Sequence, residues 1–331
     1  MRENNLIEAV QTERDAEMVV DPIPQPYKTG YVTLVGRPNV GKSTLINTLL
    51  SQKVAAVSPK PQTTRKRQLG ILTLENAQII FQDAPGIHQP RHKLGQFMLQ
   101  EAIDALKDAD VLLFMVDASQ PPCEDDEQAA AELRERPQPT FLVLNKIDLL
   151  SKKQSLKGVI SRYQADYQKL LPQAKVMAVS ALQYNSLAQL LAEIINILPE
   201  HPAFFEDEQL TDWYERDIAA ELLREASLNC LRDEVPHGIA VRIDEYTERS
   251  ERGAFIAATL FCERESQKAI IIGKHGEMLK QIGSEARHEI EAMSGRKVFL
   301  EIRVKTQKNW RNNVKSLKSF GYPIPKFTKI K

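Results

Sequence analysis

Short apolar runs alternate with amphipathic segments through the first two thirds of the chain. The apolar runs predict strands at 31–35, 71–74, 78–81, 111–116, 141–144 and 176–179. Between them, apolar residues recur at helical spacing and predict helices over 42–52, 94–106, 124–135, 156–170 and 186–197. Strands and helices that alternate in this way form a mostly parallel sheet with helices on both faces, and such sheets bind ligands at the carboxyl ends of their strands. We therefore expect an α/β domain.

A different order of elements follows a linker that carries two prolines. A long amphipathic helix is predicted over 210–231, two strands at 237–246 and 253–262, helices within 268–293 and a strand at 297–304. The order α-β-β-α-α-β predicts a smaller α+β domain. The expected limits are an extension over 1–28, the α/β domain over 29–198, the linker over 199–209, the α+β domain with a basic C-terminal helix over 210–322 and a tail over 323–331.

Composition agrees with two domains and narrows the class of protein. The chain has 331 residues, of which 42% are hydrophobic, enough for two ordinary cores. It has no run of about 18 apolar residues and no basic N-terminal region before an apolar run, so we expect a protein that is neither secreted nor membrane-spanning. Its cysteines lie far apart without a CxxC pair, which favours packing roles over zinc or disulfides for Cys123, Cys230 and Cys262.

The net charge of zero hides an asymmetry along the chain. From Ser266 to Lys331 there are 15 Lys and Arg against 5 Asp and Glu, a balance of +10, so the remainder carries −10. A basic C-terminal region points toward a polyanion. The alternative is a solvated charged surface without a ligand, which only a binding motif can exclude.

A phosphate-binding loop of the form G-x-x-x-x-G-K-S joins the first predicted strand to the first predicted helix. Its glycines let backbone N–H groups curl around phosphates, Lys42 can reach the outer phosphates, and the Ser43 hydroxyl is a hard ligand for Mg²⁺. The dipole of the following helix favours the same anion. The loop predicts that a nucleoside triphosphate binds at Gly36, Arg37, Pro38, Asn39, Val40, Gly41, Lys42, Ser43 and Thr44.

Further motifs follow later strands. Asp83 and Gly86 can supply a carboxylate near Mg²⁺ and an N–H that senses a γ-phosphate. Asp148 can accept two hydrogen bonds from the N1–H and amine of guanine, a donor pair that adenine lacks. These residues therefore favour a guanine nucleotide.

The neighbours of Asp148 complete the predicted base site. Asn145 can pin the loop and meet the base edge, while the stem of Lys146 can cover the base plane. Backbone N–H groups after the last strand would lie near the guanine oxygen, at Ser180, Ala181 and Leu182. The motifs, in this order, resemble the GTPase signature, so we expect GTP and GDP as ligands.

The segment 60–67, between the phosphate loop and Asp83, is polar and carries a proline. It is typical of a switch loop that orders around γ-phosphate and Mg²⁺, although a solvated basic loop is the alternative. Ile87 follows Gly86 where Ras-like GTPases carry a water-positioning Gln, so unaided hydrolysis should be slow. We interpret the neighbouring His88 as a solvated loop residue.

A Gly-x-x-Gly loop lies between two predicted helices of the second domain. In KH modules this arrangement lets a nucleic-acid backbone approach closely and rest on helix N-termini. We expect RNA at Gly273, Lys274, His275, Gly276, Lys280, Lys305, Lys308 and Arg311. Trp310 and Phe320 stand among these basic residues, where they could stack on bases. For Trp310 the alternative is that it packs a terminal helix onto the domain.

From 31 to about 322 the chain resembles the Era family of bacterial GTPases. The segments GRPNVGKSTL, PQTTR, NKID and IIGKHG match that family in order and spacing. The resemblance implies an α/β P-loop GTPase domain followed by a type II KH domain that binds the 3′ end of 16S rRNA in 30S subunit assembly, coupled to growth. It implies that GTP favours RNA binding and that hydrolysis times release. It also implies a cytoplasmic protein with peripheral association to the inner face of the membrane, and nothing in the sequence suggests more than a monomer.

The resemblance also assigns residues to the reaction. Catalytic roles fall to Lys42, Thr64 and Gly86. The expected ligands of Mg²⁺ are Ser43, Asp83 and Thr64, or else Thr63. Asn39 looks like the asparagine that helps hold K⁺ against the phosphates in the TrmE and Era group, with turn formation as its alternative role.

Two features depart from the family pattern. Ala84 stands where members usually have Thr, which should leave metal ligation by Asp83 intact, and the acidic extension over 1–28 is atypical. Two alternative functions remain at this point. One is a membrane-associated signalling GTPase whose basic C-terminus binds lipid headgroups, and the other is an RNA-binding module that uses GTP as a ligand without hydrolysing it.

Overall fold

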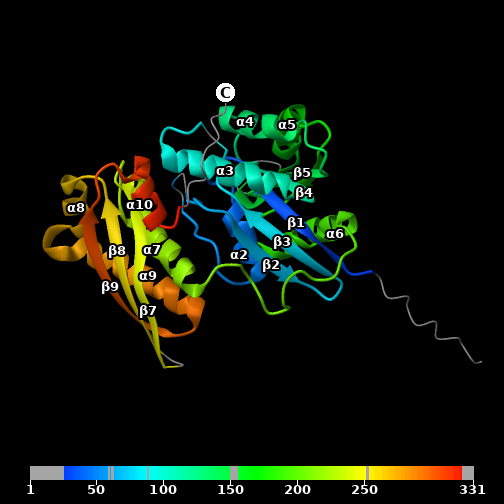
Figure 1. Ribbon diagram of the computed structural model, residues 1–331. Coiled ribbons are helices and arrows are strands. Elements are labelled where there is room, and N and C mark those ends of the chain that lie inside the picture. Colours follow the sequence, from blue (N-terminus) through cyan, green and yellow to red (C-terminus); the bar gives the residue numbers. More distant parts are fainter. Residues whose placement is uncertain are drawn as a thin grey trace, which may run out of the picture.

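The computed structural model describes residues 26–58, 60, 63–87, 89–149, 156–250 and 253–322, with the backbone alone for 156–162 and 250. Two domains lie side by side (Figure 1). Nearly all of the predicted extension, the tail over 323–331, His88 and part of the turn before 253 lie outside the described residues.

The larger domain contains a six-stranded sheet with the order β2-β3-β1-β4-β5-β6. Neighbouring strands are parallel, except that β2 runs antiparallel to β3. Every residue of β3 and β4 is buried, as expected of strands that are covered on both faces. The strands are β1 (Lys28–Val35), β2 (Gln68–Thr73), β3 (Ala77–Asp83), β4 (Val111–Asp117), β5 (Thr140–Asn145) and β6 (Lys175–Ala178).

Helices cover both faces of this sheet, so the predicted α/β class is confirmed. Leu45 of α2 and Leu190 of α6 share the core of one face. Leu106 of α3 and Tyr167 of α5 belong to the core of the other, with α4 beside them. The first helix ends before the predicted residue 52, because Ser51 adopts a left-handed conformation that caps it. The helices are α2 (Lys42–Leu50), α3 (Lys93–Lys107), α4 (Glu124–Leu133), α5 (Leu156–Leu170) and α6 (Ala188–Ile197).

The smaller domain has the predicted order α-β-β-α-α-β. Its three strands have the order β7-β8-β9, with β8 antiparallel to β7 and parallel to β9. Leu223 of α7 and Ile290 of α9 pack with Ile256 of β8 in one buried core. The elements are α7 (Glu215–Cys230), β7 (Ala240–Ser250), β8 (Gly253–Cys262), α8 (Glu265–Ile272), α9 (Glu277–Ser294), β9 (Lys297–Thr306) and a terminal α10 (Val314–Ser319).

The segment between the domains is attached to the larger one by hydrogen bonds. The side-chain oxygen of Gln78 accepts from the backbone N–H groups of Phe204 and Phe205 at 2.8 and 3.0 Å. Farther along, the N–H of Ile71 donates to the carbonyl of Leu210 at 2.8 Å. The predicted linker therefore follows the first domain closely before α7 begins.

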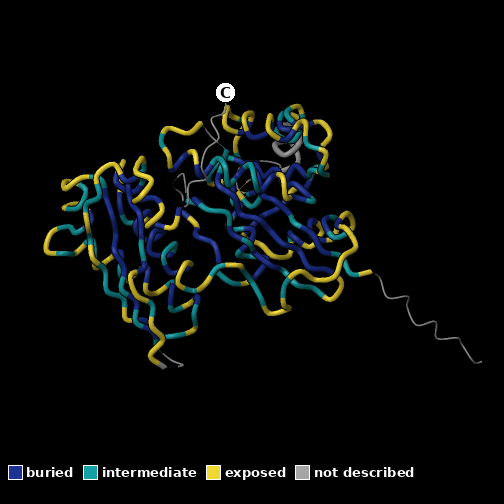
Figure 2. The backbone as a smooth tube through the Cα atoms, in the orientation of Figure 1, coloured by how far each residue is buried: buried dark blue, intermediate teal, exposed yellow. Residues whose placement is uncertain are grey.

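A fourth apolar cluster joins the domains through α3 and α10. Phe97 and Met98 pack with Trp310, Leu317 and Phe320. Figure 2 shows dark blue, buried stretches in both of the domains that this cluster joins. Trp310 is fully buried and its indole N–H donates to a backbone carbonyl at 2.8 Å. The suggestion that Trp310 and Phe320 stack on bases is therefore wrong, because both rings are used in packing. Within the described part of the chain, no helix combines the length and apolar character needed to cross a membrane.

Candidate nucleotide-binding site and nucleic-acid surface

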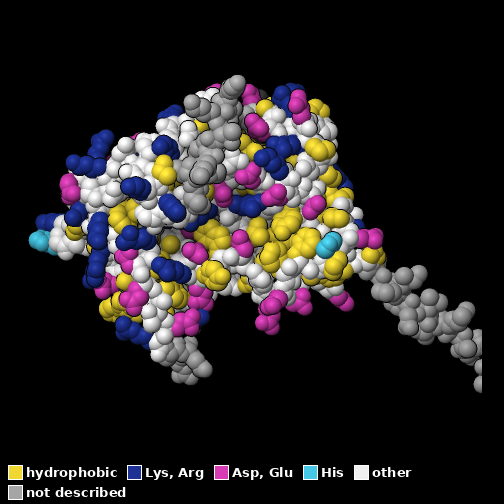
Figure 3. Space-filling model, in the orientation of Figure 1, with side chains coloured by type: hydrophobic (Ala, Val, Ile, Leu, Met, Phe, Trp, Pro, Cys, Tyr) yellow, Lys and Arg dark blue, Asp and Glu magenta, His cyan; other side chains and the backbone are white. Residues whose placement is uncertain are grey.

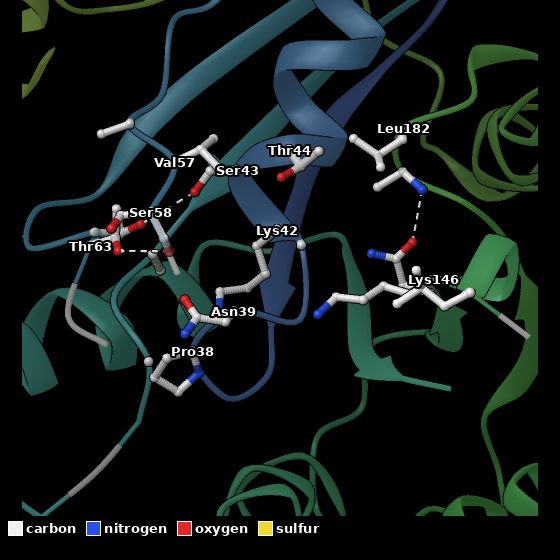
Figure 4. Close-up of a pocket in the computed structure, with 18 of the residues that line it drawn as sticks. Pro38, Asn39, Lys42, Ser43, Thr44, Val57, Ser58, Thr63, Lys146 and Leu182 are labelled. Carbon is white, nitrogen blue, oxygen red and sulfur yellow. Dashed lines mark hydrogen bonds between the residues drawn. The ribbon is translucent and has the colours of Figure 1, made fainter. Parts of the chain in front are cut away.

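A cavity of about 350 Å³ opens at the carboxyl ends of the strands of the larger sheet. Figure 4 shows Lys42, Ser43 and Thr44 at the start of α2, with Thr63 on one side and Lys146 and Leu182 on the other. The predicted residues that line the cavity are Pro38, Asn39, Gly41, Lys42, Ser43, Thr44, Thr63, Thr64, Gly86, Asn145, Lys146, Asp148, Ala181 and Leu182. Lining residues that sequence reasoning missed are Ala56, Val57, Ser58, Ala84 and Leu149.

The phosphate loop needs glycine at positions 36 and 41 for steric reasons. Gly36 has φ 150° and Gly41 φ 105°, a region in which side chains are strained. A Cβ on Gly36 would collide with the backbone oxygen of Met115, and one on Gly41 with the side-chain amide of Asn145. The glycines therefore allow the loop to lie directly against β4 and the end of β5.

Lys42 is buried beneath the phosphate loop. Its amine donates to the carbonyls of Gly36 at 2.9 Å and Arg37 at 3.1 Å. Burial lowers the pKa of Lys42, and the nearby carboxylate of Asp83 partly offsets this effect. The positive charge is thus held where an anion bound in the loop would lie.

Three oxygen-bearing side chains converge at the start of α2. The hydroxyl of Ser43 donates to Oδ2 of Asp83 at 2.5 Å, and that of Thr64 to the same oxygen at 3.1 Å. The hydroxyl of Thr63 instead donates to the carbonyl of Lys60 at 2.7 Å. Of the two threonines considered, Thr64 is therefore the one that lies with Ser43 and Asp83.

These three residues fit Mg²⁺. Oδ1 of Asp83 is buried without a hydrogen-bond partner among the described residues, as expected of an oxygen reserved for a cation. Burial raises the pKa of Asp83, although Lys42 and the two hydroxyl donors oppose the rise. A divalent cation would offset the same burial cost of the carboxylate.

Asn145, the last residue of β5, connects two loops beside the cavity. Its Nδ2 donates to the carbonyl of Val40 at 2.7 Å, and its Oδ1 accepts from the N–H of Ala181 at 2.8 Å. The side chain is 1% exposed. The predicted pinning role is visible in these bonds, which tie the phosphate loop to the segment after β6.

Asp148 and Lys146 both follow β5 but have partners on different segments. Oδ1 of Asp148 accepts from the hydroxyl of Ser180 at 2.6 Å, which orients the carboxylate. Ser180 is buried and does not itself line the cavity, so its side chain supports Asp148. The amine of Lys146 lies 2.8 Å from Oδ2 of Asp117.

Asp117 was missed by sequence reasoning. It ends β4, where the strand pattern itself could have drawn attention to a terminal carboxylate. Burial alone would raise the pKa of Asp117, but hydrogen bonds from Lys146 and Ser119 outweigh it and hold that pKa below its usual value. Asp117 therefore stays ionised and anchors the amine of Lys146.

Arg37 belongs to the phosphate loop, but its side chain does not line the cavity. Its Nε lies 3.2 Å from a carboxylate oxygen of Asp126, which is fully buried on α4. The hydroxyl of Tyr167 donates to the other oxygen at 3.3 Å. The Arg37 side chain therefore anchors the loop to α4. The predicted residues Gly36, Arg37 and Val40 do not line the cavity.

The Gly-x-x-Gly loop joins α8 to α9. Gly273 has φ 74° and Gly276 φ 82°, and a Cβ on Gly273 would lie 2.9 Å from the backbone N of Met278. Lys274, His275 and Lys280 are exposed around this loop. The loop is therefore open to a ligand, with the start of α9 directly behind it.

The other predicted RNA contacts lie at the end of β9 and beyond it. Lys305 and Lys308 are exposed, whereas the guanidinium of Arg311 is paired with Glu263, with Nε at 3.1 Å. Figure 3 shows Lys and Arg side chains gathered over the second domain on the face in view. Arg311 thus differs from the two lysines, since its charge is partly compensated.

Two family descriptions match the chain. Residues 31–146 match the family described as 50S ribosome-binding GTPase, and residues 234–311 match the KH domain. The GTPase Era of Ruminiclostridium cellulolyticum is 45% identical over 300 residues, which cover 91% of this chain and 99% of that protein. The GTPase Era of Geobacter metallireducens is 44% identical over 298 residues, covering 90% and 98%.

Two solved structures share the fold over almost their whole length. One is the crystal structure of Era in complex with MgGDPNP and nucleotides 1506–1542 of 16S ribosomal RNA, with TM-score 0.83, 40% identity and coverage of 90% of this chain and 99% of that chain. The other is an Aquifex aeolicus Era variant bound to GDP and AlF4⁻, with TM-score 0.83, 39% identity and coverage of 89% and 99%.

Proposed function

The chain belongs to the Era family of GTPases and hydrolyses GTP, and from this premise we propose that it binds the 3′ end of 16S rRNA and acts in assembly of the 30S subunit. The observation that carries the proposal is that one chain contains both the cavity for a guanine nucleotide and an open Gly-x-x-Gly loop. A relative of the same two-domain fold is bound to MgGDPNP and to nucleotides 1506–1542 together. The alternative of a module that binds GTP without hydrolysis is set aside.

At one end of the cavity, the proposal assigns residues to the phosphates and to Mg²⁺. The ammonium of Lys42 holds the outer phosphates, and the N–H of Gly86 contacts the γ-phosphate. Ser43, Thr64 and Asp83 hold Mg²⁺, which neutralises charge on the phosphate oxygens when bound. Ile87, in the position of a water-orienting Gln, makes the unaided reaction slow.

Asn39 is assigned to a K⁺ ion beside the phosphates. It has φ 66°, a left-handed conformation, and lines the cavity. Asn39→Ala should then remove any stimulation of hydrolysis by K⁺ over Na⁺ while GDP affinity is kept. Equal rates of the original protein in the two salts would exclude this role.

The base end reads guanine. The carboxylate of Asp148, oriented by Ser180, accepts from N1–H and the amine, and the stem of Lys146 lies over the ring. Asn145 sets the distance between the phosphate loop and the backbone at Ala181 and Leu182. Guanine is thereby placed at a fixed span from the phosphates.

The second domain takes RNA on the Gly-x-x-Gly loop. Gly273 and Gly276 let the backbone approach, and Lys274, His275, Lys280, Lys305, Lys308 and Arg311 supply donors to phosphates and base edges. GTP favours binding and hydrolysis times release. The same proposal includes the domain limits given above, a monomer, a cytoplasmic location with peripheral contact to the inner face of the membrane, and a coupling to growth.

The test is binding of a single-stranded oligonucleotide from the 3′ end of 16S rRNA, beside a scrambled oligonucleotide. The protein is loaded with GDP or GDPNP. Selective binding, tighter with GDPNP, is expected. Lys274→Asp should weaken it, whereas Lys169→Asp, a matched change at an exposed residue of α5, should not.

Equal or absent binding of both oligonucleotides would contradict the proposed binding of rRNA, whereas the assignment as a GTPase would stand. Salt-sensitive binding to anionic vesicles, without selective RNA binding, would then favour the membrane-associated signalling GTPase. That alternative uses the same exposed lysines, but without dependence on the order of bases.

A further inference from the structure

Thr64 lies between two residues that the second domain holds. The carbonyl of Thr63 accepts a hydrogen bond from the guanidinium of Arg224 on α7. On its other side, Arg65 donates to the carbonyls of Ile239 at 2.7 Å and His237 at 3.3 Å. The hydroxyl of Thr64 itself lies with Asp83 in the first domain. The second domain therefore contacts this segment on both sides of Thr64, at the backbone of Thr63 and at the side chain of Arg65.

The side chains that make these contacts are charged and buried. Arg224 and Arg65 are each 1% exposed. Arg224 is oriented by Glu221, one turn earlier on α7, whose carboxylate accepts from its Nε at 2.8 Å. A guanidinium can bond a carboxylate and still direct another N–H elsewhere, because its five donors are fixed in one plane. Glu221 therefore fixes the donor that Arg224 presents to Thr63.

The same face of α7 also holds the segment that precedes Thr63. Glu225 accepts from the N–H of Val57 at 3.0 Å and pairs with Lys53 at 2.7 Å. One turn farther on, Asn229 accepts from the hydroxyl of Ser58 at 2.9 Å. Residues at 221, 224, 225 and 229 share one helix face, so α7 presents a continuous row of partners to this segment.

We propose that Arg224, oriented by Glu221, is a positioning residue for Thr64, so that the second domain sets the geometry of the metal and γ-phosphate site. This inference rests on the role given to Thr64 under the proposed function. A hydrogen bond to the preceding carbonyl fixes the peptide from which Thr64 projects. Thermodynamic linkage then requires that a nucleotide state which displaces Thr64 also weakens the contact with α7.

The experiment compares full-length proteins in steady-state GTP hydrolysis, with GDP and GDPNP affinities measured in parallel. The principal variant joins Arg224→Met to Glu221→Gln, so that no buried carboxylate loses its partner. Arg224→Lys keeps the charge with one ammonium. Arg216→Met is the matched control, because Arg216 lies on the same helix and donates to Ile243 within the second domain. Thr64→Ala reports on Thr64 alone.

The double variant should lose about tenfold or more in kcat and bind GDPNP more weakly, since small displacements of reacting groups have effects of this size. Its GDP affinity should stay within about twofold of the original, because the interaction at issue is made with the triphosphate. Arg224→Lys should recover part of the loss, and Arg216→Met should change none of these values.

Two results would overturn the inference. One is a folded double variant with unchanged kcat and GDPNP affinity while Thr64→Ala is impaired, which would leave the proposed function intact. The other is an equal loss of GDP and GDPNP affinity, which would indicate general damage to the cavity. An unimpaired Thr64→Ala would instead count against the role of Thr64 itself and so against that part of the proposed function.

Discussion

The amine of Lys146 lies 2.8 Å from the carboxylate of Asp117, while the backbone of Lys146 is left-handed with φ 64°. The ion pair holds the amine at the end of β4 and leaves the aliphatic stem at the cavity wall. A non-glycine residue in this conformation is strained, so the contacts around it must keep it there. The pair therefore preforms one wall of the cavity.

Asp117→Ala should weaken GDP and GTP binding together, by about tenfold, because the stem of Lys146 is no longer held and an ionised partner is lost from a partly buried pair. The preference for guanine should persist, since Asp148 is untouched. Titration with fluorescent GDP and GTP measures both affinities. Asp166→Ala, which removes the exposed partner of Lys169, is the control. A change in base preference would contradict the assigned role of Lys146.

Asp148→Asn should exchange guanine for xanthine. In the proposed site the carboxylate accepts from two guanine donors, whereas an amide there can donate to the additional carbonyl of xanthine. Loss of a paired buried donor or acceptor at such a site can cost a factor of about 10⁴ in discrimination. Competition between GDP and XDP measures the exchange, with Asp166→Asn as the control. Unchanged preference for GDP would remove Asp148 from the base site.

The stability of the folded protein should fall in mild acid because of His92, the N-cap residue of α3. Its Nδ1 accepts from the N–H of Gly95 at 2.9 Å, and burial, followed by repulsion from Arg311 and Arg65, holds the pKa of His92 below its ordinary value. The unfolded chain therefore takes up a proton near pH 6.5, before the folded protein does. The stabilisation is present above that pH and is lost as pH falls toward the folded pKa.

His92→Asn should keep the helix cap without its titration, because an Asn side chain also accepts from the backbone at this position. Its melting temperature should match the original at about pH 7.5 and exceed it at about pH 5.5. His237, whose pKa burial also lowers, maintains part of the dependence. His288→Asn, at an exposed imidazole, should keep the full acid sensitivity. Equal acid losses in all three proteins would exclude His92 as a source.

The sequence could predict those parts of the site that belong to short sequence motifs. The phosphate loop, Asp83, Asp148 and the Gly-x-x-Gly loop each follow a strand or separate two helices, so spacing alone places them at the right ends of the elements. The family and the α/β and α+β classes were confirmed on the same basis.

Contacts between distant segments left no such pattern. Arg224 and its partner Thr63 are 161 residues apart in the sequence, and Arg65 and its partner Ile239 are 174 apart. Nothing in the sequence around either arginine distinguishes it from an arginine on the surface. Arg37 was predicted to bind nucleotide as a member of the loop, yet its partner Asp126 lies on a helix that carries several acidic residues. Burial selects which charge is paired, and burial follows from tertiary packing.

The two tryptophans of the chain provide an optical test of coupling between the domains. Arg65 lies 5.8 Å from the ring centroid of Trp310, and Lys66 lies 5.7 Å from that of Trp213. A cation at this distance is attracted to the ring face and alters the environment of the indole. Since both cations follow Thr64 directly, displacement of Thr64 should move them relative to the rings.

Exchange of GDP for GDPNP should therefore change the intrinsic tryptophan emission, and Thr64→Ala should reduce that change. Trp213→Phe is the more informative single variant, because Trp213 is partly exposed while Trp310 is fully buried in the cluster between the domains. Trp310→Phe must be compared at matched fractions folded, since the smaller ring leaves a cavity. Identical emission in both nucleotide states would show that the segment after Thr64 does not follow the nucleotide. Coupling would then have to use other contacts between the domains, such as the packing of α3 against Trp310.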